Sequence, residues 1–136
     1  ILGVQESYLQ QNIWLDIVNN PFADFISYED IFIRNKFRFK DALVYANKFI
    51  AGGFTGIELD LDVIENTVTS AISPSGVHSM HARQYVSFFG AQTKAAYLHI
   101  AEGAAALEDG QKQDTIGKLI ALLVADFIKA GAGNSI

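Results

Sequence analysis

The clearest periodic pattern in the chain is Asp114-Thr-Ile-Gly-Lys-Leu-Ile-Ala-Leu-Leu-Val-Ala-Asp-Phe-Ile-Lys-Ala130. Its apolar residues recur every three or four positions, which is the spacing of one face of an α-helix. The pattern predicts a helix over 114–130 whose apolar stripe faces a core. The members of this stripe are Ile116, Leu119, Ile120, Leu123, Phe127 and Ile128.

Segments upstream show similar spacing, and turn residues separate them. Pro21 and Pro74 lie where the apolar periodicity lapses. The acids within 58–65 suit the first turn of a helix, because the amino end of a helix carries partial positive charge. Gly90 and Gly103 indicate close packing or a bend. The predicted helices are Ser7–Val18, Asp24–Ile50 with a break near Asn35–Phe37, Glu58–Ile72, Ser79–Leu107 and Asp114–Ala130.

No segment shows a period-two alternation of useful length, so no strand is predicted. The sequence therefore predicts an all-α fold, an antiparallel four-helix bundle with an additional C-terminal helix. A length of 136 residues fits one domain, 1–136. The bundle is expected over about 7–107, and the appended helix and tail over about 112–136.

Composition excludes several classes of protein. Half of the residues are hydrophobic and 18% are charged, so a disordered chain is not expected. Fifteen acidic residues against ten basic ones give a net charge of −5, which argues against nucleic acid as a partner. The absence of cysteine excludes disulfides, thiolate metal sites and cysteine catalysis.

Membrane and targeting signals are few. The most apolar stretch, Leu119–Ala125, is seven residues long and is bracketed by charges, so no spanning helix is predicted. The chain begins at Ile1 without a methionine, which indicates either a removed targeting segment or a late start.

Motifs for catalysis and metal binding are weak. His78 and His81 are three positions apart, and His99 lies too far along the same predicted helix to join them at one ion. The sequence holds no Gly-x-Ser-x-Gly elbow, phosphate-binding glycine loop or His-Glu-x-x-His motif. We expect no catalytic residue, no metal and no cofactor, and hence a protein that is not an enzyme.

The strongest local feature is a concentration of positive charge. Arg34, Lys36, Arg38 and Lys40 alternate with aromatic residues. On a continuous helix Phe32 would point inward, as would Phe39, while the basic groups reach outward. This arrangement predicts electrostatic docking on an acidic partner, and the alternative is a solvated helix face.

The run Tyr28-Glu-Asp-Ile-Phe-Ile-Arg-Asn-Lys-Phe-Arg-Phe-Lys40 resembles the PsbQ-type extrinsic subunits of photosystem II. In that family an aromatic residue, a branched residue, an Asn and alternating basic residues open a long helix of a four-helix bundle. Tyr28, Ile33 and Asn35 match this pattern together with the basic residues of 36–40. The resemblance extends loosely to about Tyr97.

A second resemblance is to the peridinin–chlorophyll proteins, an all-helical, pigment-holding family. It covers Pro21-Phe22 to Ile26, Leu43 to Gly53 and Ala71 to Tyr85. That family carries a His-His pair just before its Ala-Ile, whereas this chain has Val68 and Thr69 there.

Together these resemblances imply a non-catalytic, PsbQ-like extrinsic subunit of photosystem II of the diatom and red-lineage type. Such a subunit would dock on the lumenal face, stabilise the oxygen-evolving complex, and contact the photosystem II core and other extrinsic subunits. It would lie in the chloroplast thylakoid lumen, peripheral to the membrane. The alternatives are a pigment-binding light-harvesting domain and a helical interaction module without a photosynthetic role. The expected partner-binding residues are Arg34, Asn35, Lys36, Arg38 and Lys40.

Overall fold

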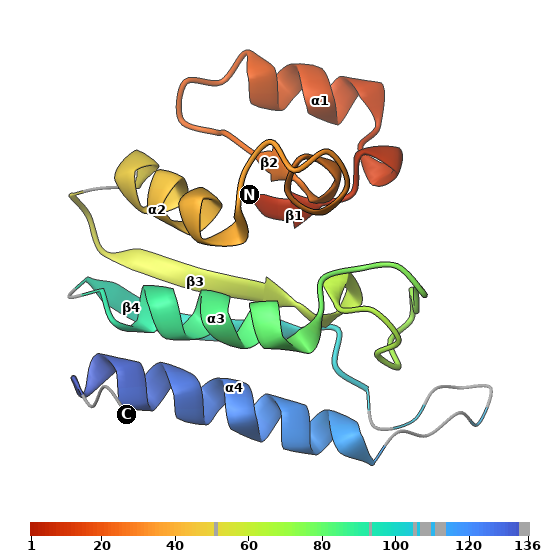
Figure 1. Ribbon diagram of the computed structural model, residues 1–136, viewed down its shortest axis with the longest axis vertical. Coiled ribbons are helices and arrows are strands. Elements are labelled where there is room, and N and C mark those ends of the chain that lie inside the picture. Colours follow the sequence, from red (N-terminus) through yellow and green to blue (C-terminus); the bar gives the residue numbers. More distant parts are fainter. Residues whose placement is uncertain (51, 93, 105, 107–109, 111–113, 134–136) are drawn as a thin grey trace. The chain divides into compact units, whose positions relative to one another are not determined.

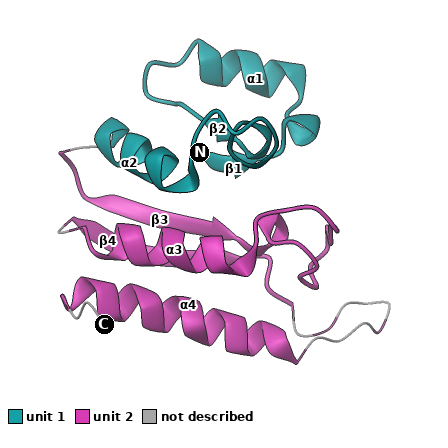
Figure 2. Ribbon diagram, viewed as in Figure 1, with its two compact units in different colours: residues 1–51 teal, residues 52–136 magenta. Residues whose placement is uncertain are grey.

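The chain folds into two compact units, residues Ile1–Ala51 (unit 1) and Gly52–Ile136 (unit 2), coloured separately in Figure 2. This computed structural model describes residues 1–50, 52–92, 94–104, 106, 110 and 114–133. Each unit combines helices with a pair of parallel strands (Figure 1). The fold is therefore α/β, and the predicted all-α four-helix bundle is wrong. That the chain forms one domain stays a prediction.

Unit 1 is built around a short parallel strand pair. Its two strands are hydrogen-bonded to each other in parallel, and a helix connects them along the chain, as parallel pairing requires. The elements are β1 (Leu2–Val4), a 3₁₀ turn (Glu6–Tyr8), α1 (Gln11–Val18), β2 (Ile26–Ser27), a π-helical turn (Glu29–Ile33) and α2 (Phe39–Phe49).

The helix predicted over 24–50 is wrong as one helix, because this range holds β2, the π-helical turn and α2. The core of unit 1 shows where the chain breaks. Ile26, Ile31 and Ala42 are buried together, and Phe32 stacks on Phe39 with ring centroids 6.0 Å apart. The inward direction of these two rings is confirmed. Asn35 takes a left-handed backbone conformation (φ 53°), which ends the π-helical turn before α2 begins. The predicted break near Asn35–Phe37 is thus confirmed, although the segment before it is a strand and a π-helical turn.

Unit 2 contains the longer strands. The two strands pair in parallel; one helix lies between them in the chain and a second helix follows the second strand. The loop between β3 and α3 includes a bridge from Ile64 to Val77. The elements are β3 (Thr55–Asp60), a 3₁₀ turn (Leu61–Val63), α3 (Ser79–Gly90), β4 (Ala95–Ala101) and α4 (Thr115–Gly131).

Two predicted helices contain the strands of unit 2. In place of the helix Glu58–Ile72 the structure has the end of β3, the 3₁₀ turn and a loop. Along β3 Ile57 and Leu59 are buried, whereas Glu58 and Asp60, which alternate with them, are exposed. This is the side-chain period of a strand. The predicted helix Ser79–Leu107 stops at Gly90 and is followed by β4, and Leu107 lies outside the described residues.

The core of unit 2 lies between the strand pair and both helices. Leu59 and Leu61 pack with Val86 of α3 and Leu123 of α4. The helix predicted over 114–130 is confirmed as α4, with two residues of its stripe buried, three packed against the core and Ile128 exposed. Within the described residues, no helix has the length and apolar character needed to cross a membrane.

Candidate functional site

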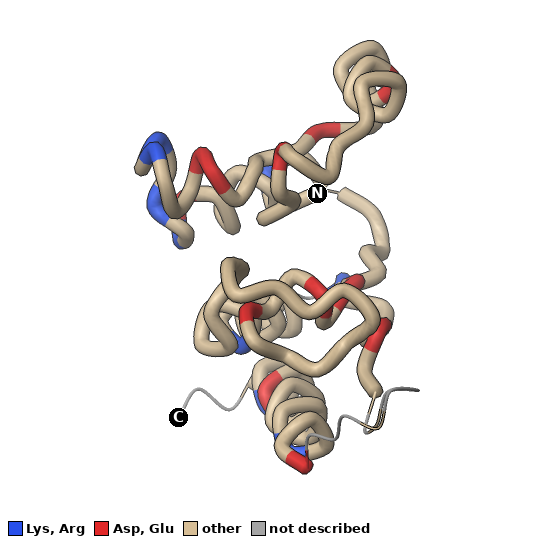
Figure 3. Tube along the Cα trace, turned by 90° about the vertical axis from the view of Figure 1, so that its right-hand side faces the viewer, with Lys and Arg blue, Asp and Glu red and all other residues tan. Residues whose placement is uncertain are grey.

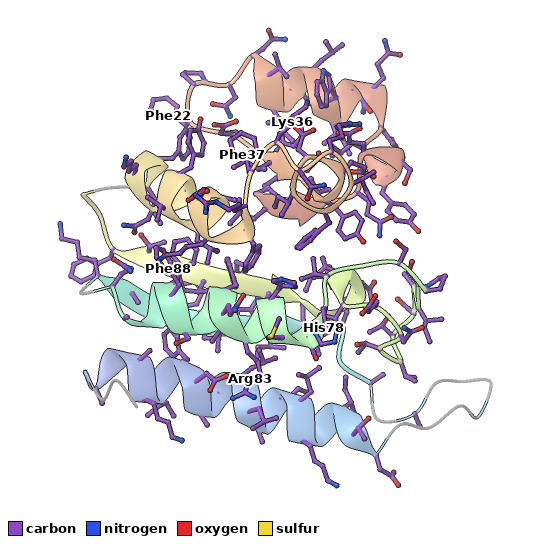
Figure 4. The ribbon with its side chains drawn as sticks, viewed as in Figure 1. Phe22, Lys36, Phe37, His78, Arg83 and Phe88 are labelled. Carbon is purple, nitrogen blue, oxygen red and sulfur yellow. The ribbon has the colours of Figure 1, made fainter. Side chains whose placement is uncertain are left out.

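The predicted partner-binding residues form no continuous basic face. Asn35 has left-handed backbone and α2 begins after Arg38, so Arg34 and Arg38 do not share a helix face as predicted. Lys36 (Figure 4) and Lys40 are both exposed. The aromatic residues of the stretch pack inward, since Phe37 contacts the unit 1 core.

Acidic neighbours pair with most of these cations. Arg34 donates to both carboxylate oxygens of Glu6 at 2.6 Å and to Asp30 at 2.5 Å. Lys36 also pairs with Asp30, at 2.9 Å, and Figure 3 marks these acidic and basic positions along the chain. Arg38 pairs with an acid of α2 at 2.9 Å. Whether the stretch binds a partner stays a prediction, but its charge is largely compensated within unit 1.

The three histidines do not meet at one point. His78 precedes α3 (Figure 4), and its Nδ1 accepts a hydrogen bond from the Met80 amide at 3.1 Å. His81 lies on α3, with its ring centroid 6.5 Å from that of His78. His99 lies on β4. Among the described residues, no group of three or more metal-ligating side chains could hold an ion.

Three acidic residues lie in the chain where β3 and β4 end. Asp60 is the last residue of β3, and its strand partner is Ala101, the last residue of β4. Asp62 follows in the 3₁₀ turn, and Glu102 directly follows β4. Because the strands are parallel, these residues share the carboxyl edge of the pair, where ligands bind in open α/β sheets. No ion pair between described residues involves them. We call Asp60, Asp62 and Glu102 the carboxyl-edge site.

Asp62 carries an unsatisfied buried oxygen. Its amide donates to Asp60 Oδ1 at 2.9 Å, which ties the two residues together through the 3₁₀ turn. Its own Oδ1 is buried and has no hydrogen-bond partner among the described residues. Burial of a carboxylate oxygen without a donor is costly, so a cation or donor from elsewhere is the natural partner for it.

Glu102 is held in an unusual backbone conformation. Its φ of 61° lies in the left-handed region, which a residue with a Cβ rarely adopts. Its carboxylate is within 3.4 Å of the Ser70 hydroxyl, which belongs to the loop between β3 and α3. Such backbone strain is typical of functional sites.

A hydrogen-bonded network lies on the strands just before this edge. The Glu58 carboxylate accepts hydrogen bonds from His99 Nδ1 and from the Tyr97 hydroxyl, and these bonds lower the pKa of Glu58. The same contact with Glu58 raises the pKa of Tyr97. Tyr85 of α3 donates to the Glu58 backbone carbonyl at 3.1 Å. We call Tyr97, Glu58 and His99 the strand network.

Each unit also has a pocket. In unit 2 a pocket of about 360 Å³ lies between the loop that follows Asp62 and the beginnings of α3 and α4, with Glu65, His78 and Thr115 in its lining. In unit 1 a mostly apolar pocket of about 240 Å³ has Phe22 and Tyr45 in its wall. The pocket of unit 2 is the one on the strand-to-helix loops, the usual place for ligands in an α/β fold.

Fold and site together define an α/β protein with parallel strands and acidic residues at their carboxyl edge. The sequence matches no protein-family model and no curated protein. Among solved structures, formiminoglutamase from Trypanosoma cruzi matches with a TM-score of 0.78 and 13% identity, over 99% of this chain and 45% of that one. Formimidoylglutamase from Bacillus subtilis matches with a TM-score of 0.76 and 18% sequence identity, over 98% of this chain and 42% of that one. Arginase from Entamoeba histolytica, solved with L-ornithine, matches with a TM-score of 0.73 and 17% sequence identity, over 93% of this chain and 41% of that one.

These matches establish the fold, and the chain spans less than half the length of each of these proteins. The fold is that of formiminoglutamases and arginases, which are hydrolases, and not that of PsbQ or peridinin–chlorophyll proteins. The predictions of a photosystem II subunit, of a pigment-binding domain, of photosystem II partners and of a protein without catalysis are therefore wrong. The location in the thylakoid lumen stays a prediction.

Sequence reasoning missed all three residues of the carboxyl-edge site. The acids of 58–65 were expected in the first turn of a helix, where they would be solvated. The signal that identifies Asp60 and Asp62 is the strict alternation Ile57-Glu-Leu-Asp-Leu-Asp62, with an apolar residue at every second position. Read as a strand, this pattern places its last acids at the strand end.

Proposed function

We propose that this chain is part of a metal-dependent hydrolase, and that Asp60 and Asp62 hold a divalent cation at the carboxyl end of β3. The observation that carries the proposal is the buried Asp62 Oδ1, which has no hydrogen-bond partner among the described residues, in a residue whose backbone amide bonds to the Asp60 carboxylate. Carboxylate oxygens are ligands that suit Mn²⁺ and Mg²⁺. One matching structure is that of the Trypanosoma cruzi formiminoglutamase with Mn²⁺, at a TM-score of 0.79.

Two carboxylates are too few for an octahedral ion such as Mn²⁺. The matching proteins are more than twice as long as the part that this chain covers. We therefore propose that further ligands come from polypeptide outside residues 1–136. Bound metal would supply an acidified water molecule for attack on the substrate. The part of this chain is to present Asp60 and Asp62 from a rigid strand end.

Glu102 is proposed to face the substrate. Its carboxylate lies at the same edge, beyond the end of β4, and is exposed. An anionic side chain at this position favours a substrate with a cationic nitrogen group, of the kind that L-ornithine carries. Ser70 supports it from the loop after β3.

The test is to measure Mn²⁺ binding by electron paramagnetic resonance. The longest polypeptide that carries residues 1–136 should bind Mn²⁺, and its variants Asp60→Asn and Asp62→Asn should each bind at least about tenfold more weakly, since each removes a ligand charge. Glu65→Gln is the matched control, because it removes a nearby acid from the pocket lining and leaves the proposed ligands intact. Equal affinity in all four proteins would contradict the proposal.

Hydrolysis is tested separately, in the longest polypeptide that carries residues 1–136. With Mn²⁺ present it should hydrolyse formiminoglutamate or L-arginine, and Glu102→Gln should reduce turnover while metal binding persists. Turnover unchanged in Glu102→Gln would remove this residue from the substrate site.

A further inference from the structure

The face of the β3–β4 pair that points away from the unit 2 core carries polar side chains. Parallel strands usually bear apolar residues on both faces. Here the side chains of Glu58 and His99 are 58% and 61% exposed, and Tyr97 is 53% exposed. These three residues, the strand network, are joined by hydrogen bonds rather than scattered on the surface.

The local backbone is built to receive this network. A Cβ atom placed on Gly56 would lie 2.2 Å from Cζ of the Tyr97 ring, so the hydroxyl end of the ring lies directly against the glycine. No residue with a side chain fits there without moving Tyr97. From this position the Tyr97 hydroxyl reaches the Glu58 carboxylate. The glycine is thus part of the arrangement.

The register of the strands is irregular just before the network. The partner of Thr55 is Ala95, but the partner of Gly56 is Tyr97, so β4 has one extra residue at Ala96. Beyond this bulge the pairing is regular, from Glu58 opposite His99 to Asp60 opposite Ala101. A slip of one residue would turn every side chain of a strand to the other face.

We propose that Glu58 and His99 are positioning residues for the carboxyl-edge site. They lock β3 against β4 in the bulged register, and this register sets Asp60 beside the strand end that Glu102 follows. Glu58 precedes Asp60 by two residues, so both side chains lie on the same face of β3. A slip of β3 that breaks the hydrogen bonds of Glu58 therefore also displaces Asp60, the proposed metal ligand. The proposal rests on the proposed function, because it assigns the network to the same site.

A surface ion pair without a positioning role is the alternative, and it would stabilise the protein little. The same unit offers a matched control, the pair of Arg83 on α3 with Asp126 on α4 at 2.6 Å (Figure 4). This pair is also partly exposed and lies between the helices rather than on the strands. Its loss affects stability without touching the strand register.

The experiment compares His99→Leu, His99→Asn and Asp126→Asn for Mn²⁺ affinity and for hydrogen exchange at the ends of β3 and β4. His99→Leu should weaken Mn²⁺ binding about tenfold, as loss of residues that orient metal ligands does, and should speed exchange of the Leu61 and Glu102 amides. His99→Asn keeps an N–H donor near Nδ1 and should restore both. Asp126→Asn should leave both unchanged.

The outcomes separate the two proposals. If the unchanged protein binds no Mn²⁺, the proposed function fails, and hydrogen exchange still decides whether the network holds the strand ends. If His99→Leu resembles Asp126→Asn in both measurements, the positioning role is wrong. Should His99→Leu fail to fold, Tyr97→Phe serves instead, because it removes one hydrogen bond of the network. Unchanged exchange in Tyr97→Phe would then overturn the proposal.

Discussion

Gly90 of α3 lies against the Phe127 ring of α4, and a Cβ atom on Gly90 would be 2.9 Å from Cδ2 of that ring. The two helices therefore approach closely at the carboxyl end of α3. Their contact closes the unit 2 core over β3 and β4, the strands that carry the carboxyl-edge site.

Gly90→Ala should destabilise unit 2. The added methyl group must displace Phe127, and overpacking of this kind costs about 1–3 kcal/mol. Urea unfolding monitored by circular dichroism measures the change. Gly117→Ala is the control, because Gly117 of α4 has open space around it. This control should gain about 0.5–1 kcal/mol from the lower entropy of the unfolded chain. Equal effects in the two variants would show that the close approach is absent.

Glu6 should make unit 1 sensitive to acid. Hydrogen bonds from Arg34 and then Ser27 lower the pKa of the Glu6 carboxyl from 4.5 to about 2. A lowered pKa in the folded state adds stability above pH 4.5, and this stability is lost as the pH falls from 4.5 to 2. Glu6→Gln should flatten the dependence of unfolding on pH in this window. Asp16→Asn, which changes an exposed acid of α1, should leave the dependence as it is.

Tyr85 should ionise late. Burial, and next the charge of Glu58, raise its pKa from 10.0 to about 12. The folded state holds this proton more tightly than the unfolded state, so the stabilising effect is complete below pH 10 and is lost as the pH rises through 12. Absorbance at alkaline pH follows tyrosinate formation. Tyr85→Phe should remove the tyrosine transition near pH 12, and its persistence in the variant would contradict the burial of this ring.

Glu102→Gly should raise stability and impair function. A left-handed backbone costs a residue with a Cβ about 1–2 kcal/mol, and glycine avoids this cost. The variant should unfold at higher urea concentration and should lose substrate affinity in the longer polypeptide. The matched comparison is Glu102→Ala, which removes the carboxylate but keeps the strained backbone. If both variants are equally stable, the strain at φ 61° is not released by glycine.

The parts of the fold that could be predicted from the sequence are those fixed by local contacts. α4 was predicted to within one residue at each end, because its apolar stripe repeats over seventeen residues. The break before α2 followed from the crowded residues around Asn35. Gly90 was predicted to mark close packing or a bend, and its contact with Phe127 confirms close packing. Each of these features is decided by residues near one another in the chain, or by a glycine.

The strands could not be predicted because their stabilisation is non-local. β4 contains Ala95, Ala96 and Leu98, which suit a helix as well as a strand. β4 is a strand because it pairs with β3. For example, Glu58 of β3 is hydrogen-bonded to His99 of β4, 41 positions away. Strand preference depends strongly on such neighbours. Once β3 was taken for a helix, Asp60 and Asp62 became acids of a first turn, and the carboxyl-edge site disappeared with the strand.

The ion pairs of unit 1 have a consequence for how ligands approach the protein. Arg34 pairs with Glu6 and Asp30, Lys36 with Asp30, and Arg38 with Asp41. Paired charges largely cancel beyond the Debye length, about 8 Å at physiological salt. With a net charge of −5, the potential felt by an approaching molecule is therefore set by the uncompensated acids. Cations and cationic metabolites are steered toward the molecule and polyanions are turned away, and raising the ionic strength slows the first encounter.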